Sequence, residues 1–171
     1  MTRFYLMRHG QTLFNTLNRI QGWCDSPLTE KGRDQARQVR AYFQKHHLNF
    51  DQYYCTTTER ASDTLELVTG QTAYHRVKGL KEMNFGIFEG QPEYLHPKTT
   101  IVGHFGNHYA QFGGESQDQF VARVVKSARE IVNKHPDQSI LAVSHAGALM
   151  TFYMLWSQSV RSSLVQVIVL S

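Results

Sequence analysis

The stretch RFYLMRHGQTLFN, residues 3–15, contains the end of the first predicted strand, and the prediction of the fold starts from this point. Residues 3–7 are mostly apolar strand formers, and the run ends abruptly in Arg8, His9 and Gly10. An isolated Arg-His pair at such a boundary is typical of a polar strand end that enters solvent. Whether this pair does more depends on where the rest of the chain places similar residues.

Outward from this stretch, strand-like and helix-like segments alternate. Helices are indicated by Thr29 as an N-cap before Ala36, Val39 and Phe43 on one face, and by a Ser116–Gln119 capping box. Two further helices are predicted over 59–68 and, as a buried helix, over 146–155. Strands are predicted over 3–7, 52–56, 72–77, 139–144 and 164–170. The alternation predicts an α/β fold, a three-layer α/β/α sandwich with a mostly parallel central sheet and helices on both faces.

Length and composition limit the class of protein. The 171 residues fit a single domain spanning 1–171, and 41% hydrophobic with 19% charged residues is typical of a soluble globular chain. The formal net charge is +4, but the cations are scattered, so we predict no nucleic-acid partner. Cys24 and Cys55 lack metal-ligand spacing.

The sequence predicts no secretory signal and no membrane span. The chain begins directly with a strand-like run, which leaves no room for a signal peptide. The longest apolar run, 146–156, is shorter than the ~20 residues that a bilayer-spanning helix needs. We therefore predict a cytoplasmic protein with no membrane partner.

Polar residues follow three of the predicted strands. Arg8 and His9 follow the first strand, Glu59 and Arg60 lie just after the strand 52–56, and His145 directly follows the strand 139–144. Ligands of open α/β sheets bind outside the carboxyl ends of the strands, so these side chains are predicted to share one crevice. Glu59 could orient Arg60 or begin a helix, and the sequence favours the helix start.

Two arginines beside two histidines suit phosphate chemistry. A guanidinium matches phosphate oxygens with paired hydrogen bonds and stays charged. Nearby cations lower the pKa of a histidine, so an imidazole can remain neutral and act as a nucleophile toward phosphorus. Departure of the leaving oxygen also needs a proton donor, for which Glu82 in GLKEMNFGIFEG is the candidate. On residue type alone, Glu89 in the same loop is nearly as good.

Six segments, taken together, resemble the histidine phosphatase superfamily, also called the phosphoglycerate mutase-like family. They are LMRHGQTLFN, RIQGWCDSPLTEKGRDQA, TTTERASDT, LKEMNFGIFEG, GGES and VSHAGAL, and they occur in the family's order and spacing over nearly the whole chain. The resemblance implies a phosphoglycerate mutase-like fold and His9 as the nucleophile that forms a phosphohistidine. It also implies Glu82, rather than Glu89, as the general acid.

Other roles are carried over by the same resemblance. Arg8, Arg60 and His145 would complete the phosphate pocket, and Asn15 would donate its amide to the same phosphate. Gln21 and Gly22 match a turn that contacts substrate. Two positions remain open: Thr12 is either a ligand contact or a loop cap, and Ala146 stands where the family commonly has Gly, Asn or Gln.

The family contains phosphatases and mutases, and the sequence favours a phosphatase. Glycolytic mutases of this family carry a long insertion with extra cations between the general acid and the second histidine. In this chain, the irregular segment 91–115 between Glu82 and His145 offers only Lys98 as a firm cation. Its aromatic residues could accept an apolar leaving group or simply cap the core; they are Tyr94, Phe105, Tyr109 and Phe112.

The expected activity is metal-independent hydrolysis of small phosphomonoesters. No cofactor or metal is expected. His104 and His108 have the i, i+4 spacing of a metal-binding pair on a helix, but Gly106 lies between them in a segment without helical pattern. The expected partner is a small phosphorylated substrate, and the sequence indicates no oligomeric state. A phosphoglycerate mutase and a non-catalytic phosphate-binding module remain the alternatives.

Overall fold

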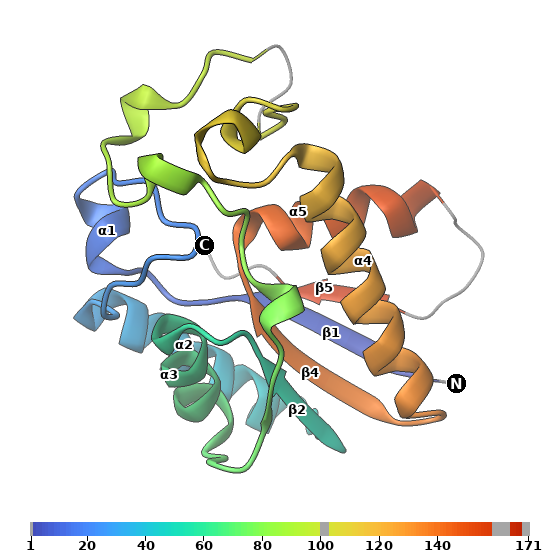
Figure 1. The fold of residues 1–171 in the computed structure, drawn as a ribbon. Helices are drawn as coiled ribbons and strands as arrows, with labels where there is room; N and C mark the ends of the chain where they lie inside the picture. The colour runs from blue at the N-terminus through green and yellow to red at the C-terminus, as the bar shows by residue number, and fades with distance from the viewer. Residues whose placement is uncertain (1, 100–102, 159–164, 169–171) are drawn as a thin grey trace.

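A computed structural model describes residues 2–99, 103–158 and 165–168. Its five strands form one sheet in the order β3-β2-β4-β1-β5, and every pairing is parallel. Figure 1 labels β1, β2, β4 and β5 of this sheet. The strands are β1 (Arg3–Arg8), β2 (Gln52–Cys55), β3 (His75–Arg76), β4 (Ser139–Ser144) and β5 (Val165–Ile168). The α-helices are α1 (Leu13–Thr16), α2 (Glu30–Lys45), α3 (Glu59–Thr69), α4 (Gln117–Lys134) and α5 (Ala146–Gln158).

Side-chain alternation along the central strands builds two separate cores. Tyr5 and Met7 of β1 face α2 and α3, where they pack with Phe43 and Leu65. The intervening β1 residues face the opposite layer of α4 and α5, together with Ile131 and Phe152; they are Phe4 and Leu6. Because successive strand residues point to opposite faces, one apolar strand supplies both cores. The predicted three-layer α/β/α sandwich is confirmed (Figure 1).

Helices α2 to α5 begin where the sequence predicted, whereas the short helix α1 was not predicted. The Thr29 hydroxyl accepts a hydrogen bond from the Gly32 N–H at the start of α2, and Ser116 and Gln119 form the predicted capping box of α4. Glu59 is the first residue of α3, which confirms the interpretation of this residue as a helix start. These caps satisfy backbone donors that the first helical turn leaves unpaired.

Two predicted elements differ markedly in extent or burial. The third strand, predicted over 72–77, is only His75–Arg76, because both residues are exposed at the sheet edge and pair with β2 alone. Helix α5 is not buried all round, since Met150, Tyr153 and Met154 are exposed. The last predicted strand is confirmed over Val165–Ile168, and its residues 164, 169 and 170 lie outside the described part of the chain.

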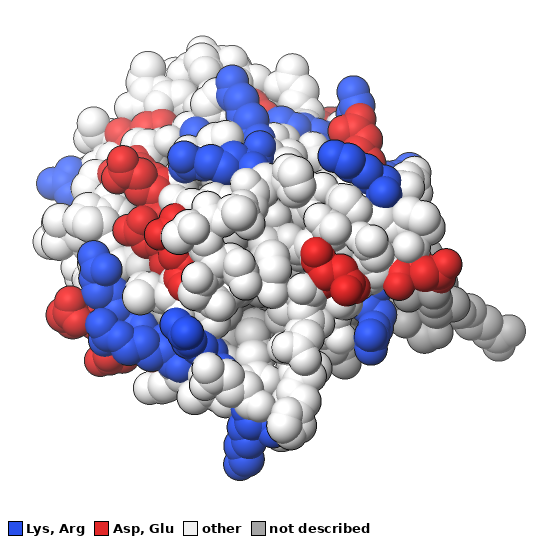
Figure 2. Space-filling model, turned by 90° about the horizontal axis from the view of Figure 1, so that it is seen from below, with Lys and Arg blue, Asp and Glu red and all other residues white. Residues whose placement is uncertain are grey.

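The surface carries charges of both signs. Figure 2 shows a face on which Lys and Arg side chains are interspersed with Asp and Glu side chains among neutral residues. Most ion pairs of α2 and α4 are exposed, such as Arg37 with Asp34, and contribute little to stability. Within the described ranges, no helix is long and apolar enough to cross a membrane.

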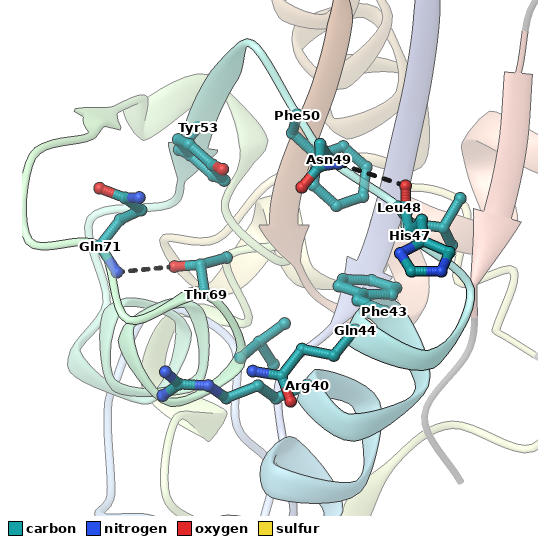
Figure 3. Close-up of a pocket in the computed structure, with 11 residues that line it drawn as sticks. Arg40, Phe43, Gln44, His47, Leu48, Asn49, Phe50, Tyr53, Thr69 and Gln71 are labelled. Carbon is teal, nitrogen blue, oxygen red and sulfur yellow. Dashed lines mark hydrogen bonds between the residues drawn. The ribbon is translucent and has the colours of Figure 1, made fainter.

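A hollow of about 330 Å³ lies at the amino end of β2, near the C-terminal ends of α2 and α3. Phe43, Phe50 and Tyr53 supply aromatic walls, and Arg40 and Gln44 lie across from Tyr53 (Figure 3). The polar residues of interest for catalysis follow the other ends of the strands, so this hollow belongs to the opposite edge of the sheet.

Candidate active site

The register of the two central strands brings the two histidines together. Strands β1 and β4 pair in parallel with Arg8 opposite Ser144, so the next residues, His9 and His145, leave neighbouring strand ends side by side. The backbone N–H of His9 donates to the Ser144 carbonyl at 3.1 Å. The imidazole centroids are 5.2 Å apart. The predicted meeting of these two strand ends is therefore observed.

His9 is held as a neutral imidazole. Its side chain is only 6% exposed, and burial together with the Arg60 charge holds its pKa well below the usual range. Nδ1 lies 2.8 Å from the Gly10 carbonyl oxygen, which can only accept, so Nδ1 carries the proton. This tautomer leaves the lone pair on Nε2, as a nucleophile requires.

His145 has a different hydrogen-bonding pattern, because both of its ring nitrogens are engaged. Nδ1 accepts from the Arg60 guanidinium at 3.0 Å, and Nε2 therefore carries the proton and donates to the Thr56 hydroxyl at 3.0 Å. Thr56 bonds in turn to the Thr58 hydroxyl at 2.9 Å. Burial and the Arg60 charge lower the pKa of His145 well below its usual value, which agrees with this neutral tautomer.

Arg60 is completely buried, and protein atoms surround its guanidinium. Nη1 donates to the Cys24 carbonyl and to the Asp25 carboxylate, at 2.8 and 2.9 Å. Nη2 donates to the Gly22 carbonyl at 2.8 Å as well as to His145. The remaining donor, Nε, is buried and has no hydrogen-bond partner among the described residues. A buried, fixed cation next to His9 suits the stabilisation of phosphoryl oxygens.

Glu82 lies across the same site and is 8% exposed. Its carboxyl accepts from the Gly147 N–H at 2.8 Å, at the start of α5, and from the Met83 N–H at 2.9 Å. Burial raises the pKa of Glu82 despite these two hydrogen bonds, which favours the protonated form that a general acid needs. The Leu80 carbonyl accepts from the Ser144 hydroxyl at 2.6 Å and ties this loop to the end of β4.

Arg8 is half-buried at the end of β1. Its charge contributes to lowering the pKa of His9 and of His145, although burial and Arg60 act more strongly on both. The same charge opposes the burial that raises the pKa of Glu82. Arg8 is thus a second cation within electrostatic range of both imidazoles and the carboxyl.

The remaining predicted binding residues form the loop beside this site. Thr12 is fully buried and caps α1: its hydroxyl accepts from the Asn15 N–H, and its backbone N–H donates to the Asn15 side-chain oxygen. This geometry favours the loop-cap interpretation of Thr12. Gln21 accepts from the Thr12 hydroxyl at 2.7 Å, and Gly22 contacts Arg60. Ala146 is exposed at the first position of α5. Contact of these residues with substrate stays a prediction.

The aromatic residues between η3 (Glu93–Leu95) and α4 divide into two groups. Phe105 and Tyr109 pack with Phe85 in a third apolar cluster, so they cap the core. Tyr94, by contrast, is 83% exposed. Phe112 is partly exposed at the end of η4 (Tyr109–Phe112). Within the described residues, no cluster of His, Cys, Asp and Glu side chains is placed to hold a metal ion.

Sequence reasoning missed the residues that hold the site together. Asp25, Thr56 and Thr58 complete the hydrogen-bond network of Arg60 and His145. Asp25 and the two threonines stand inside the quoted segments RIQGWCDSPLTEKGRDQA and TTTERASDT, which was a usable signal. Their partners, however, lie 35 or more residues away along the chain, except for the contact between the two threonines.

Comparison with known families places this site in context. The sequence model of one protein family, the histidine phosphatase superfamily (branch 1), matches residues 4–167 of this chain. The chain belongs to the histidine phosphatase superfamily. Its phosphoglycerate mutase-like fold is shared with YhfR of Bacillus stearothermophilus, at a TM-score of 0.80 and 31% identity over 92% of this chain and 81% of that one.

Some proteins that resemble the chain are named as phosphatases, whereas others are named as a phosphoglycerate mutase or a phosphoglycerate mutase-like protein. A metal-independent phosphoserine phosphatase of Arabidopsis thaliana is 28% identical, covering 93% of this chain and 70% of its own. Phosphoserine phosphatase of Entamoeba histolytica, solved with 3-phosphoglyceric acid, aligns at a TM-score of 0.73 and 29% identity over 92% of this chain and 81% of its own. The chain spans about two thirds of the length of the curated relatives it matches.

Proposed function

We propose that this protein is a metal-independent phosphatase that hydrolyses small phosphomonoesters through a phosphohistidine on His9, with Glu82 as general acid and base. The carrying observation is the pairing of opposite protonation preferences in one site: burial favours neutral His9 and protonated Glu82. Nucleophilic attack needs the first, and leaving-group protonation needs the second.

In the first step, Nε2 of His9 forms a bond to phosphorus while the bond from phosphorus to the ester oxygen breaks. Glu82 gives its proton to that oxygen, so the substrate leaves as an alcohol and Glu82 becomes a carboxylate. Arg60 and Arg8 stabilise the charge on the transferring phosphoryl group. The Gly10 carbonyl oxygen, which accepts a hydrogen bond from Nδ1–H, stabilises the positive charge of the phosphorylated imidazole.

In the second step, water attacks phosphorus and the bond to His9 breaks. Glu82, now ionised, accepts the proton of the attacking water and regains its starting form. Inorganic phosphate leaves, and Nε2 recovers its lone pair. Both steps need one proton donor and acceptor, and burial of Glu82 next to the start of α5 supports this double role.

His145 supports catalysis through Arg60. Its two nitrogens are engaged by the guanidinium and by Thr56, so in the absence of substrate the ring orients Arg60 instead of presenting a free donor. The hydroxyl chain through Thr56 fixes the tautomer that can accept from Arg60. A phosphate contact by His145 would need one of these two bonds to be exchanged.

The test is release of phosphate from a chromogenic aryl phosphate with a chelator present. We expect turnover to persist with chelator and a phosphoenzyme to be trapped on the wild-type protein but not on His9→Ala. Activity that depends on added metal, or full activity in His9→Ala, would contradict the mechanism. Incubation with 3-phosphoglycerate separates the alternatives, because a phosphatase releases inorganic phosphate and a mutase yields 2-phosphoglycerate.

A further inference from the structure

Glu89 is a half-buried carboxylate that the proposed chemistry does not use. Its Oε1 accepts from the backbone N–H groups of Trp23 and Phe85, at 2.8 and 2.9 Å. Its Oε2 accepts from those of Gly22 and Cys24, at 3.1 and 2.9 Å. An ionised carboxylate has about four lone-pair sites, so this network saturates it. Glu89 is therefore engaged in structure and has no acceptor site left for a substrate proton.

The same short turn that donates to Glu89 holds Arg60 with its carbonyl oxygens. Arg60 donates to the carbonyls of Gly22 and Cys24, each at 2.8 Å, and to the adjoining Asp25 carboxylate. The turn 22–25 thus has amides on one carboxylate and carbonyls on one guanidinium. The three peptide units of this turn therefore connect the Glu89 carboxylate to the Arg60 guanidinium.

Close packing prevents this turn from shifting independently of the Glu89 loop. A side chain at Gly22 would place its Cβ 2.1 Å from the Met83 carbonyl oxygen and 2.4 Å from Glu89 Oε1. Both distances are below any ordinary contact, so the backbone of the turn lies directly on the loop 82–89. Trp23 adds a further tie, because its indole N–H donates to the Glu82 carbonyl at 3.0 Å.

We propose that Glu89 is a positioning residue that fixes the turn 22–25 and thereby aims the Arg60 guanidinium at the transferring phosphoryl group. This inference rests on the proposed phosphatase function. The physical reason is that charge-assisted bonds from four amides are strong and directional, whereas a neutral amide side chain offers a single acceptor oxygen. Loss of the carboxylate leaves amides of the turn unpaired and loosens the turn, although its packing on the loop 82–89 and the Trp23 bond remain.

The experiment compares Glu89→Gln with Asp51→Asn in the full chain. Asp51 is the matched control, because its carboxylate also accepts a backbone N–H, that of Ser139 at 2.7 Å, but at the opposite edge of the sheet. The probe is orthovanadate, which mimics the transferring phosphoryl group. We expect Glu89→Gln to lower kcat for an aryl phosphate and to weaken vanadate inhibition by ~10-fold or more. Asp51→Asn should change neither.

A second readout separates positioning from a loss of folding alone. Arg60 lowers the pKa of His9, so a displaced guanidinium should move the acidic limb of kcat/KM to higher pH in Glu89→Gln. Loss of the Glu89 charge by itself would move that limb the other way. Unchanged kcat, vanadate inhibition and acidic limb per folded molecule would overturn the proposal.

Further arms keep the two proposals distinguishable. If Glu89→Gln does not fold, Glu89→Asp replaces it, because this variant keeps the charge but cannot reach all four amides. The same fall in kcat and in vanadate inhibition is expected. Wild-type values of both in Glu89→Asp would overturn the inference. If the wild-type protein binds vanadate but hydrolyses no ester, the proposed function fails, whereas weakened vanadate binding in the Glu89 variants still supports the positioning role.

Discussion

Similar side chains lie in different surroundings at the two ends of the parallel strands. The end of the sheet where the strands begin is called the amino edge here, and the end where they finish is called the carboxyl edge. At the carboxyl edge, Arg60 and His145 are buried and bonded to each other. At the amino edge, Arg40 and His47 line the hollow of Figure 3, and both are exposed. An arginine and a histidine therefore do not make a site by residue type. Burial removes water from the first pair, and together with the Arg60 charge it lowers the pKa of His145.

The largest expected effect tests the two edges directly. His9→Ala removes the proposed nucleophile and should lower kcat by ~10³-fold or more, since loss of a covalent nucleophile is among the costliest changes in an active site. His47→Ala, its counterpart at the amino edge, should leave kcat within about twofold. Steady-state hydrolysis of an aryl phosphate measures both. Equal losses in the two variants would erase the distinction between the edges.

Glu82→Gln sharpens the comparison within the carboxyl edge. The amide cannot give a proton, so turnover of alkyl phosphates should fall by ~10²-fold or more. Aryl phosphates, whose leaving oxygen needs less protonation, should slow much less. The measurement is kcat for a matched alkyl and aryl pair. Equal slowing of both esters would count against the acid role of Glu82.

Gly147→Ala tests how closely the start of α5 holds this carboxyl. The added Cβ would lie 2.3 Å from Glu82 Oε1, so the carboxyl must move. We expect kcat for alkyl phosphates to fall by ~10–100-fold, because small misplacement of a catalytic group is costly. The double variant Glu82→Gln/Gly147→Ala should be about as slow as Glu82→Gln alone. Additive losses would show that the methyl group acts elsewhere.

The pH dependence of stability gives a smaller effect with a defined sign. Folding lowers the pKa of His9 well below 6.5, the value for the unfolded chain. At a pH between the folded and the unfolded pKa, the unfolded chain therefore binds a proton that the folded chain does not. Stability that depends on neutral His9 is therefore present above 6.5 and decreases as pH falls. Relative to His9→Ala, the unfolding constant of the wild type should rise up to ~10-fold per pH unit below 6.5. Urea unfolding at three pH values measures this, and parallel profiles would contradict it.

The smallest expected effect concerns the hollow itself. Arg40→Ala removes an exposed guanidinium that lies over Gly70 at the end of α3. We expect the free energy of unfolding to change by less than ~0.5 kcal/mol and kcat to stay within about twofold. Thermal unfolding and aryl phosphate hydrolysis check the two values. A large fall in activity would mean that the amino edge is coupled to catalysis.

Much of the fold could be predicted because its signals are local. Strands β1 and β4 are apolar runs, and the caps at Thr29 and Ser116 are sequence patterns with a direct hydrogen-bonding cause. The third strand was predicted too long because an edge strand pairs on one side only, and no local pattern marks where that pairing stops. The outer face of α5 was missed because Met and Tyr are read as buried from sequence.

The site was predictable in its chemistry and less so in its support. Convergence of His9, Arg60 and His145 followed from strand ends, since parallel strands share one carboxyl edge. The difference between Glu82 and Glu89 could not be derived from residue type, because it lies in burial and in amides brought from residues 22–24. Those amides approach only after the chain has folded.

The pairing of Arg8 with Ser144 also limits where this chain can tolerate insertions. One extra residue within β1 would turn His9 toward the opposite helix layer, because strand side chains alternate. Extra residues next to the exposed Gly103 and His104, by contrast, would lengthen a surface connection without altering that pairing. Diversity in length among proteins with this architecture is therefore expected in such surface connections, while the spacing from strand to histidine stays constant.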